Sequence, residues 1–205
     1  MELRRVVVTG IGAITPVGNT FPETWENLKA GVSGCAPIQR FDASNFKTQF
    51  ACEVKNYDVM DHFDRKEARK IDPYTQFALI AVKEAVADSK LDLDAVDKDR
   101  VGVIWGSGIG GLKTFQDEVS GFATGEGTPR FNPFFIPKMI ADIASGLISM
   151  EFGFRGPNFT TVAACASSTN ALIDAFNYIR LGKADMIVSG GSEASIYEAG
   201  IGGFN

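Results

Sequence analysis

The sequence is poor in the residues that most often bind metals or form disulfides. Its 205 residues include one histidine, His62, and three cysteines, Cys35, Cys52 and Cys165. The cysteine count is odd and no two are spaced as C-x-x-C, so the pattern indicates neither a disulfide framework nor a zinc site. We expect no metal and no bound cofactor. His62 lies in a polar stretch, where a single histidine is typical of the surface.

The chain also lacks a positive net charge and long apolar runs. Its 20 Lys and Arg against 25 Asp and Glu give a net charge of −5, which disfavours non-specific binding to nucleic acid. No apolar run approaches the roughly 20 residues of a membrane-spanning helix. The apolar run in the opening MELRRVVVTG is too short for a signal peptide. We therefore expect a cytoplasmic globular protein that contacts no membrane.

Short apolar runs closed by Gly or Ser are typical of strands covered on both faces. Such runs occupy residues 4–14, 100–108, 158–165 and 184–194. Helical patterns lie between and after them, at residues 20–31, 74–90, 137–152 and 166–182. This alternation predicts an α/β fold with a mixed, largely parallel sheet between helices. Small residues on several faces of the last helix predict that it is buried between layers, and the stretch 121–132 is the best loop candidate.

The stretch FTTVAACASSTNAL, residues 159–172, places a lone cysteine between an apolar run and a helical pattern. A strand that leads into a nucleophile and then directly into a helix is a recurrent catalytic arrangement, because the sharp turn lifts the side chain out of the sheet. The helix amino terminus favours the thiolate of Cys165 and offers free N–H groups to an oxyanion. The pattern fits a nucleophile that attacks a thioester, although a buried structural cysteine has the same local pattern.

Two other motifs suggest different chemistry. The stretch GSGIGG, residues 106–111, matches the dinucleotide-binding signature G-x-G-x-x-G after a strand. The acidic residue expected about 20 positions further on is missing, because that region reads GFATGEGTPRF. A hydrolase with a nucleophile elbow needs a histidine after the nucleophile, and none follows Cys165. Cys35 and Cys52 lack the strand–cysteine–helix context.

Seven motifs stand in the order found in the β-ketoacyl-acyl carrier protein synthases: RRVVVTGIGAITPVGNT, DRKEARKID, GSGIGGL, NPFFIP, GFRGPN, AACASSTNA and VSGGSEA. From Arg4 to Asn205 the sequence resembles the chain-elongating type II enzymes, over the first half of the family's usual length. The resemblance implies a thiolase-like fold, of which residues 1–205 form the amino-terminal half without its last strand. It also implies a decarboxylating Claisen condensation between an acyl-cysteine and malonyl-acyl carrier protein.

The resemblance assigns roles to individual residues of this sequence. Cys165 matches the nucleophile that accepts the acyl group. Ile109, inside GSGIGGL, matches a residue that gates the acyl pocket. Phe135, or its neighbour Phe134, matches a residue that closes this pocket across a dimer. Phe204, in GGFN, matches a phenylalanine beside the active-site entrance.

The resemblance also implies partners. Lys66, Arg69 and Lys70 match basic residues that face the acidic acyl carrier protein, which delivers acyl and malonyl groups, although a solvated helix face has the same composition. The family's homodimer implies that strand 158–165 lies at a sheet edge and pairs with its copy.

The family's second half, which carries two histidines, a lysine and a Gly-Phe-Gly-Gly loop, has no counterpart in this sequence. His62 matches neither histidine. The ending EAGIGGFN stops without a finished element, as a cut chain does, so we expect that residues 1–205 alone do not condense. Two alternatives stay open: a related ketosynthase of polyketide assembly, or a non-catalytic piece that only binds carrier protein or a partner subunit.

Overall fold

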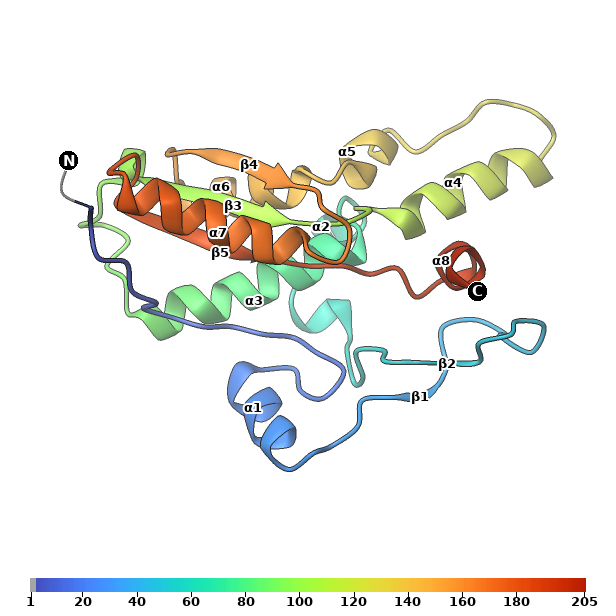
Figure 1. The fold of residues 1–205 in the computed structure, drawn as a ribbon. Helices are drawn as coiled ribbons and strands as arrows, with labels where there is room; N and C mark the ends of the chain where they lie inside the picture. The colour runs from blue at the N-terminus through green and yellow to red at the C-terminus, as the bar shows by residue number, and fades with distance from the viewer. Residues whose placement is uncertain (1–2) are drawn as a thin grey trace.

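A computed structural model describes residues 3–205, which form a three-stranded parallel sheet covered by helices (Figure 1). The strand order is β4 (Asn158–Thr161), β3 (Val101–Gly106), β5 (Met186–Gly191). Ile104 in the central strand is opposite Phe159 on one side and Ser189 on the other. Because the strands are parallel, their carboxyl ends meet at one edge of the sheet, where α/β proteins place their sites.

The central strand β3 supplies side chains to two cores. Val103 and Trp105 belong to the larger cluster, with residues of the helices on one face. Ile104 belongs to a second cluster, with Ala171 and Ala175 on the opposite face. This alternation is the period of two that a strand covered on both faces requires. The sheet therefore lies between two helical layers.

Helix α7 (Ser167–Arg180) packs on one face of the sheet, while α3 (Pro73–Ser89) and α6 (Ile143–Phe152) share the core on the other (Figure 1). The remaining helices and the two-stranded ribbon surround this body: α1 (Phe21–Lys29), α2 (Arg65–Ala68), α4 (Leu112–Thr124), α5 (Phe135–Met139), α8 (Glu198–Phe204), the 3-10 turns η1 (Val59–Asp61) and η2 (Lys98–Arg100), and strands β1 (Ala36–Pro37) and β2 (Phe50–Ala51). No helix within residues 3–205 has the length and apolarity to cross a membrane.

Three of the four expected strands are present, each shorter than expected, and the first is wrong. Residues 4–14 form no strand, and Val8 is 79% exposed. This segment packs instead on α3, so closely that a Cβ at Gly12 would lie 2.0 Å from the Ala81 carbonyl oxygen. The N–H groups of Ile11 and Ala13 donate to the side chains of Asp88 and Glu84 of that helix, at 2.9 and 2.8 Å. Carboxylates therefore take the hydrogen bonds that a neighbouring strand would make.

Two further expectations need correction. The helical pattern 137–152 is two helices, because the chain leaves helical geometry at Ile140 and restarts at Ile143. The last long helix, α7, is buried along one side only, since Leu172 and Ile173 are 54% and 52% exposed. The loop begins later than expected, at Gly125, because α4 continues to Thr124. Helix α1 does begin as expected, with the Thr20 hydroxyl accepting from the Glu23 N–H at 3.3 Å.

Candidate active site

Turns that follow the three parallel strands meet at the carboxyl edge of the sheet. The glycine-rich stretch 107–111 follows β3, Cys165 follows β4, and Ser192–Glu193 follow β5. The Trp105 indole donates to the Ser192 hydroxyl at 3.0 Å, and the Ser192 N–H donates to the Gly106 carbonyl at 3.1 Å. Three motifs far apart in the sequence are thus brought together by the topology.

Cys165 lies on a sharp turn between β4 and α7, as the sequence predicts. The residue before it, Ala164, has a φ of +48°, a left-handed conformation that costs a residue with a Cβ about 1–2 kcal/mol. Cys165 is exposed. Within residues 3–205 the N–H groups of Cys165, Ser168 and Thr169 donate to no acceptor. An exposed thiol beside free N–H groups at the positive end of a 14-residue helix can attack a carbonyl and bind the resulting oxyanion.

Ser167 holds this turn in place. Its side chain is buried, and its hydroxyl donates to the Ala164 carbonyl at 2.7 Å while accepting from the Ala163 N–H at 2.9 Å. Its backbone N–H also donates to the Ala164 carbonyl, at 3.1 Å. The hydroxyl therefore bridges the two peptide groups that flank the strained residue. Sequence reasoning treated Ser167 only as a small neighbour and missed this role.

The start of α7 rests directly on the end of β3. A Cβ at Gly106 would lie 2.4 Å from the carbonyl carbon of Ser167 and 2.5 Å from the nitrogen of Ser168. Only a residue without a side chain allows this approach. Gly106 therefore positions the helix amino terminus, and with it Cys165, against the sheet.

The glycine-rich turn after β3 binds a carboxylate of the chain itself. Glu193 Oε2 accepts from the N–H groups of Gly108 and Ile109, at 2.7 and 3.2 Å. Burial raises the pKa of the Glu193 carboxyl, although the hydrogen bonds from Gly108 and Ile109 act in the opposite direction. These two N–H groups would otherwise be available to a phosphate, so this geometry supports rejecting the dinucleotide reading. Glu193 was also missed, because nothing in the local sequence pairs it with a turn 85 residues away.

The turn also approaches Cys165 on one side and α5 on the other. A Cβ at Gly108 would lie 3.3 Å from the Ala164 carbonyl oxygen, and one at Gly111 would lie 2.3 Å from the Lys138 carbonyl oxygen. Ile109, in the middle of the turn, is 44% exposed. The residue expected to gate an acyl pocket therefore lies in a turn that contacts the nucleophile's own loop.

The aromatic residues expected at the pocket are not all near one another. Phe135 opens α5, with its ring centroid 5.6 Å from that of Phe131 and 6.4 Å from that of Phe115. Phe134 precedes it, and the Lys70 ammonium lies 5.4 Å from the Phe134 ring centroid. Phe204 lies at the end of α8 and is 80% exposed.

The expected basic residues are exposed on and after α2. Lys66 is inside this helix, Arg69 caps its carboxyl end, and Lys70 follows. None of the three forms an ion pair within residues 3–205. His62, also exposed, stacks on Tyr57 with ring centroids 5.8 Å apart. Across the described chain, no three His, Cys, Asp or Glu side chains gather as they would around a metal ion.

Fold and site together define an α/β protein that presents a thiol on a strained strand-to-helix turn. The family described as "Beta-ketoacyl synthase, N-terminal domain" matches residues 3–205, and the chain belongs to this family. The resemblance and the thiolase-like fold are therefore confirmed.

Curated relatives and solved structures agree with this assignment. The chain is 44% identical over 202 residues to 3-oxoacyl-[acyl-carrier-protein] synthase 2 of Staphylococcus aureus (strain COL), covering 98% of this chain and 49% of that protein. It is 45% identical over 204 residues to the protein of the same name from Synechocystis sp., covering 100% and 49%. The chain thus spans about half the length of the curated relatives it matches.

Among solved structures, the ishigamide ketosynthase/chain length factor is similar with a TM-score of 0.89 at 27% identity, covering 98% of this chain and 50% of that one. The structure titled "AntDE:AntF (apo): type II PKS acyl-carrier protein in complex with its ketosynthase bound to the hexaketide" is similar with a TM-score of 0.82 at 25% identity, covering 97% and 53%.

Proposed function

We propose that this chain supplies the acyl-accepting site of a 3-oxoacyl-[acyl-carrier-protein] synthase of fatty acid biosynthesis. The observation that carries the proposal is the exposed thiol of Cys165 on a strained turn, next to N–H groups without acceptors in residues 3–205. The curated relatives with this name, at 44% and 45% identity, support the reaction type.

In the first step, the Cys165 thiolate attacks the carbonyl carbon of an acyl thioester on acyl carrier protein. The free N–H groups at the start of α7 stabilise the oxyanion. The carbon–sulfur bond to the carrier then breaks, and the carrier leaves as a thiol after taking up a proton. In the condensing step, a malonyl thioester loses carbon dioxide, and its carbanion attacks the acyl-cysteine. This frees the Cys165 thiolate and yields a 3-oxoacyl product two carbons longer.

Three further assignments belong to this proposal. Ile109, Phe134, Phe135 and Phe204 would form and close the acyl pocket. Lys66, Arg69 and Lys70 would contact the carrier protein. A homodimer would pair the free edge of β4 with its copy, in keeping with the position of β4 at one side of the sheet and the 63% exposure of Val162.

A polyketide ketosynthase is the second candidate, because the similar solved structures come from such systems. Their identities, 25% and 27%, are well below the 44% shared with the Staphylococcus aureus protein. The comparison favours fatty acid biosynthesis.

The acyl-transfer step can be tested on the chain itself. Incubation with octanoyl-loaded acyl carrier protein should add one octanoyl group to the peptide that contains Cys165, measured by mass spectrometry. The Cys165→Ala variant should gain none. If the unaltered chain binds the loaded carrier but gains no mass, the non-catalytic alternative is correct and the proposal fails.

Reversing the charges of Lys66, Arg69 and Lys70 to Glu should slow acyl transfer from carrier protein about tenfold at low salt, because cations steer an acidic partner during encounter. Transfer from a small octanoyl thioester should keep its rate. The difference should shrink toward twofold in 0.5 M salt, where screening acts within about 3–5 Å. A matched control reverses three exposed lysines elsewhere, Lys47, Lys55 and Lys90. Equal slowing by both triple variants would refute a specific docking surface.

Enlarging Ile109 should change acyl-chain selectivity. The Ile109→Phe variant adds volume in a turn fixed by Glu193 on one side and α5 on the other, so a long acyl chain should lose access before a short one. The ratio of hexadecanoyl to hexanoyl transfer to Cys165 should fall about tenfold or more, the scale of steric discrimination in apolar pockets. The Leu28→Phe variant, on exposed α1, should leave the ratio unchanged. An unchanged ratio in both would remove Ile109 from the pocket.

A further inference from the structure

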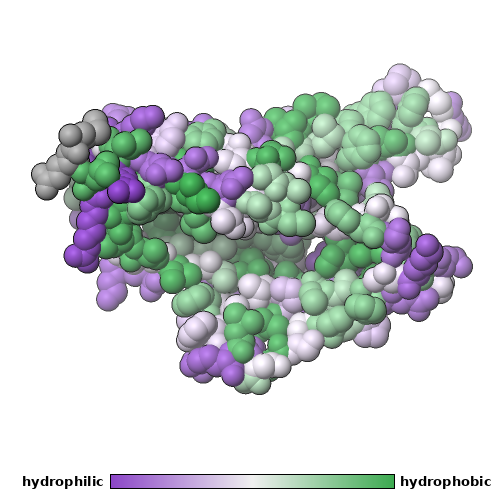
Figure 2. Space-filling view, viewed as in Figure 1, coloured by the Kyte–Doolittle hydropathy of each residue, from purple (hydrophilic) through white to green (hydrophobic). Residues whose placement is uncertain are grey.

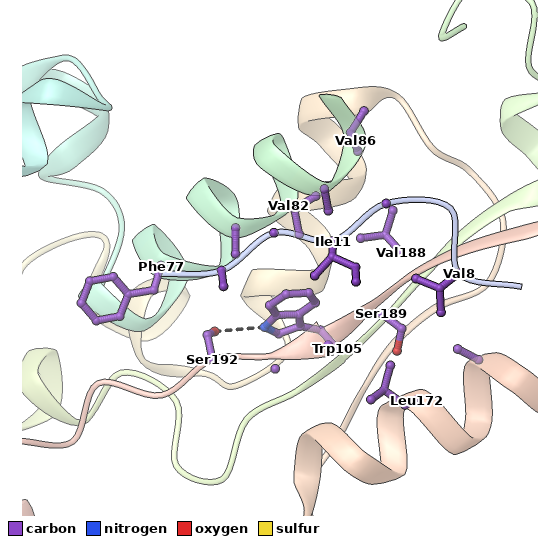
Figure 3. A pocket seen from close by; sticks show the side chains of 18 of the residues that line it. Val8, Ile11, Phe77, Val82, Val86, Trp105, Leu172, Val188, Ser189 and Ser192 are labelled. Atoms are coloured by element: carbon purple, nitrogen blue, oxygen red, sulfur yellow. Dashed lines mark hydrogen bonds between the residues drawn. The ribbon is translucent and has the colours of Figure 1, made fainter. Parts of the chain in front are cut away.

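A cavity of about 920 Å³ lies between strand β5 and the amino-terminal segment, residues 5–16 (Figure 3). Figure 2 shows hydrophobic residues around a hollow on this side of the molecule. None of the residues proposed for acyl transfer lines the cavity. Its function is therefore a separate question from the chemistry at Cys165.

Two long walls of the cavity are backbone edges without partners. Among residues 3–205, β5 pairs with β3 alone, so its other edge is open. On the opposite side, residues 5–10 make no backbone hydrogen bond in the described chain, and this segment runs past β5 in Figure 1. Both segments line the same cavity. Open edges of this kind bind an added strand.

The other two walls are apolar side chains from the helices above and below the sheet. Phe77, Val82 and Val86 of α3 line one wall, and Leu172, Phe176 and Ile179 of α7 line the other. Leu172 and Phe176 are 54% and 44% exposed. An occupant in the plane of the sheet would meet apolar surface on both of its faces. That is the environment of a strand buried between two helical layers.

A buried hydroxyl in the lining lacks a partner. Ser189, in the middle of β5, has an Oγ atom that is buried and forms no hydrogen bond with any described residue. A buried unpaired hydroxyl costs free energy unless a ligand or partner satisfies it. The free edges and this hydroxyl both call for an occupant that can donate and accept hydrogen bonds. A hydrocarbon chain would satisfy the apolar walls but leave these groups unpaired.

The volume fits one short strand. A strand between two layers occupies about 160 Å³ per residue, given about 4.8 Å between strands, about 10 Å between layers and about 3.3 Å per residue along the chain. A cavity of about 920 Å³ therefore holds about six residues, which matches the six residues of β5.

The walls are held apart by contacts outside the cavity's apolar centre. At one end, Arg4 pairs with Asp185 at 2.6 Å, and the Arg4 N–H donates to the Arg180 carbonyl at 3.1 Å. At the other end, Asp88 and Glu84 bind the N–H groups of Ile11 and Ala13. The amino-terminal segment is thus anchored to α3 and to the start of β5 while the space between remains open.

We propose that this cavity is a slot that accepts one extended β-strand from a separate polypeptide segment. The strand carries apolar side chains on both faces and hydrogen-bonds to β5 on one side and to residues 5–10 on the other. Such a strand is absent from residues 3–205, whereas the chain spans only about half the length of its curated relatives. We infer that the unmatched half of such a relative contains a segment that binds here in trans.

Synthetic 12-residue peptides that tile the unmatched half of the Staphylococcus aureus relative provide the probe. We expect peptides from one apolar, strand-forming region to bind the chain with a dissociation constant below about 100 µM, measured by fluorescence anisotropy. Hydrogen exchange should slow at amides of β5 and of residues 5–10 when the peptide binds. Amides of β4, at the opposite edge of the sheet, should be unaffected.

Two neighbouring residues of α7 provide matched variants. Leu172 lines the cavity and Ile173 does not, yet their exposures are nearly equal at 54% and 52%. The Leu172→Asp variant should weaken peptide binding at least tenfold, because it places a carboxylate against an apolar strand, and the Ile173→Asp variant should change it less than twofold. The proposal is overturned if no peptide binds, if both variants weaken binding equally, or if palmitate fills the cavity and peptides do not displace it.

Discussion

The Gly106→Ala variant should lose about 3 kcal/mol of unfolding free energy, a large part of the 5–15 kcal/mol typical of a domain. The added Cβ would lie 2.4–2.6 Å from backbone atoms of Ser167 and Ser168. No side-chain rotation can relieve an overlap with backbone, so α7 must move away from the end of β3. The cost therefore exceeds the 1–3 kcal/mol of an ordinary overpacked core side chain, or lies at its upper limit.

The matched control is Gly121→Ala. Gly121 lies inside α4, and a Cβ there would meet nothing within 4 Å, so this variant should gain about 0.5–1 kcal/mol from the lower entropy of its unfolded chain. Urea unfolding followed by circular dichroism gives both values. Because α7 also carries the amino terminus next to Cys165, alkylation of Cys165 by iodoacetamide should slow in Gly106→Ala and not in Gly121→Ala. Equal stability of the two variants would show that the contact at Gly106 is loose.

Local patterns predicted most of the elements but not their partners. The segments around Val103, Val188 and Val8 all read as short β-branched runs closed by glycine. Only the first two are strands, because a strand requires a neighbour to share its backbone hydrogen bonds, and the segment around Val8 faces a cavity instead. Periodicity cannot report that absence. The same limit applies to α7, whose exposed Leu172 reads as a core residue from sequence alone.

The site was predictable where its residues are neighbours in the sequence. Cys165, the small residues beside it and the helix that follows form one continuous stretch, and the structure has the turn that this stretch predicts. Glu193 and Gly108 are 85 residues apart, so their hydrogen bond depends on the strand order β4-β3-β5, which no local pattern contains. The roles of Ile109, Phe134, Phe135 and Phe204 depend on a bound acyl chain and stay predictions.

The Ser167→Ala variant should accept acyl groups at Cys165 about 10–100-fold more slowly than the unaltered chain. Its hydroxyl bridges the Ala164 carbonyl and the Ala163 N–H, and without that bridge Ala164 can leave its left-handed conformation. Displacement of a nucleophile by about 1 Å costs on the order of 100-fold in rate. The variant should also lose about 1–3 kcal/mol of unfolding free energy, because the Ala163 N–H is left unpaired.

Two companions separate the turn geometry from general loss of stability. The Ser168→Ala variant removes the next hydroxyl along α7, which forms no hydrogen bond with the described residues, and should keep both rate and stability. The Ala164→Gly variant should gain up to about 1 kcal/mol, since glycine adopts a positive φ without the cost of a Cβ. Acyl transfer is measured by mass with a small octanoyl thioester, and stability by urea unfolding. If Ser167→Ala loses stability but transfers at the full rate, Ser167 supports the fold alone and Cys165 does not depend on the strained turn.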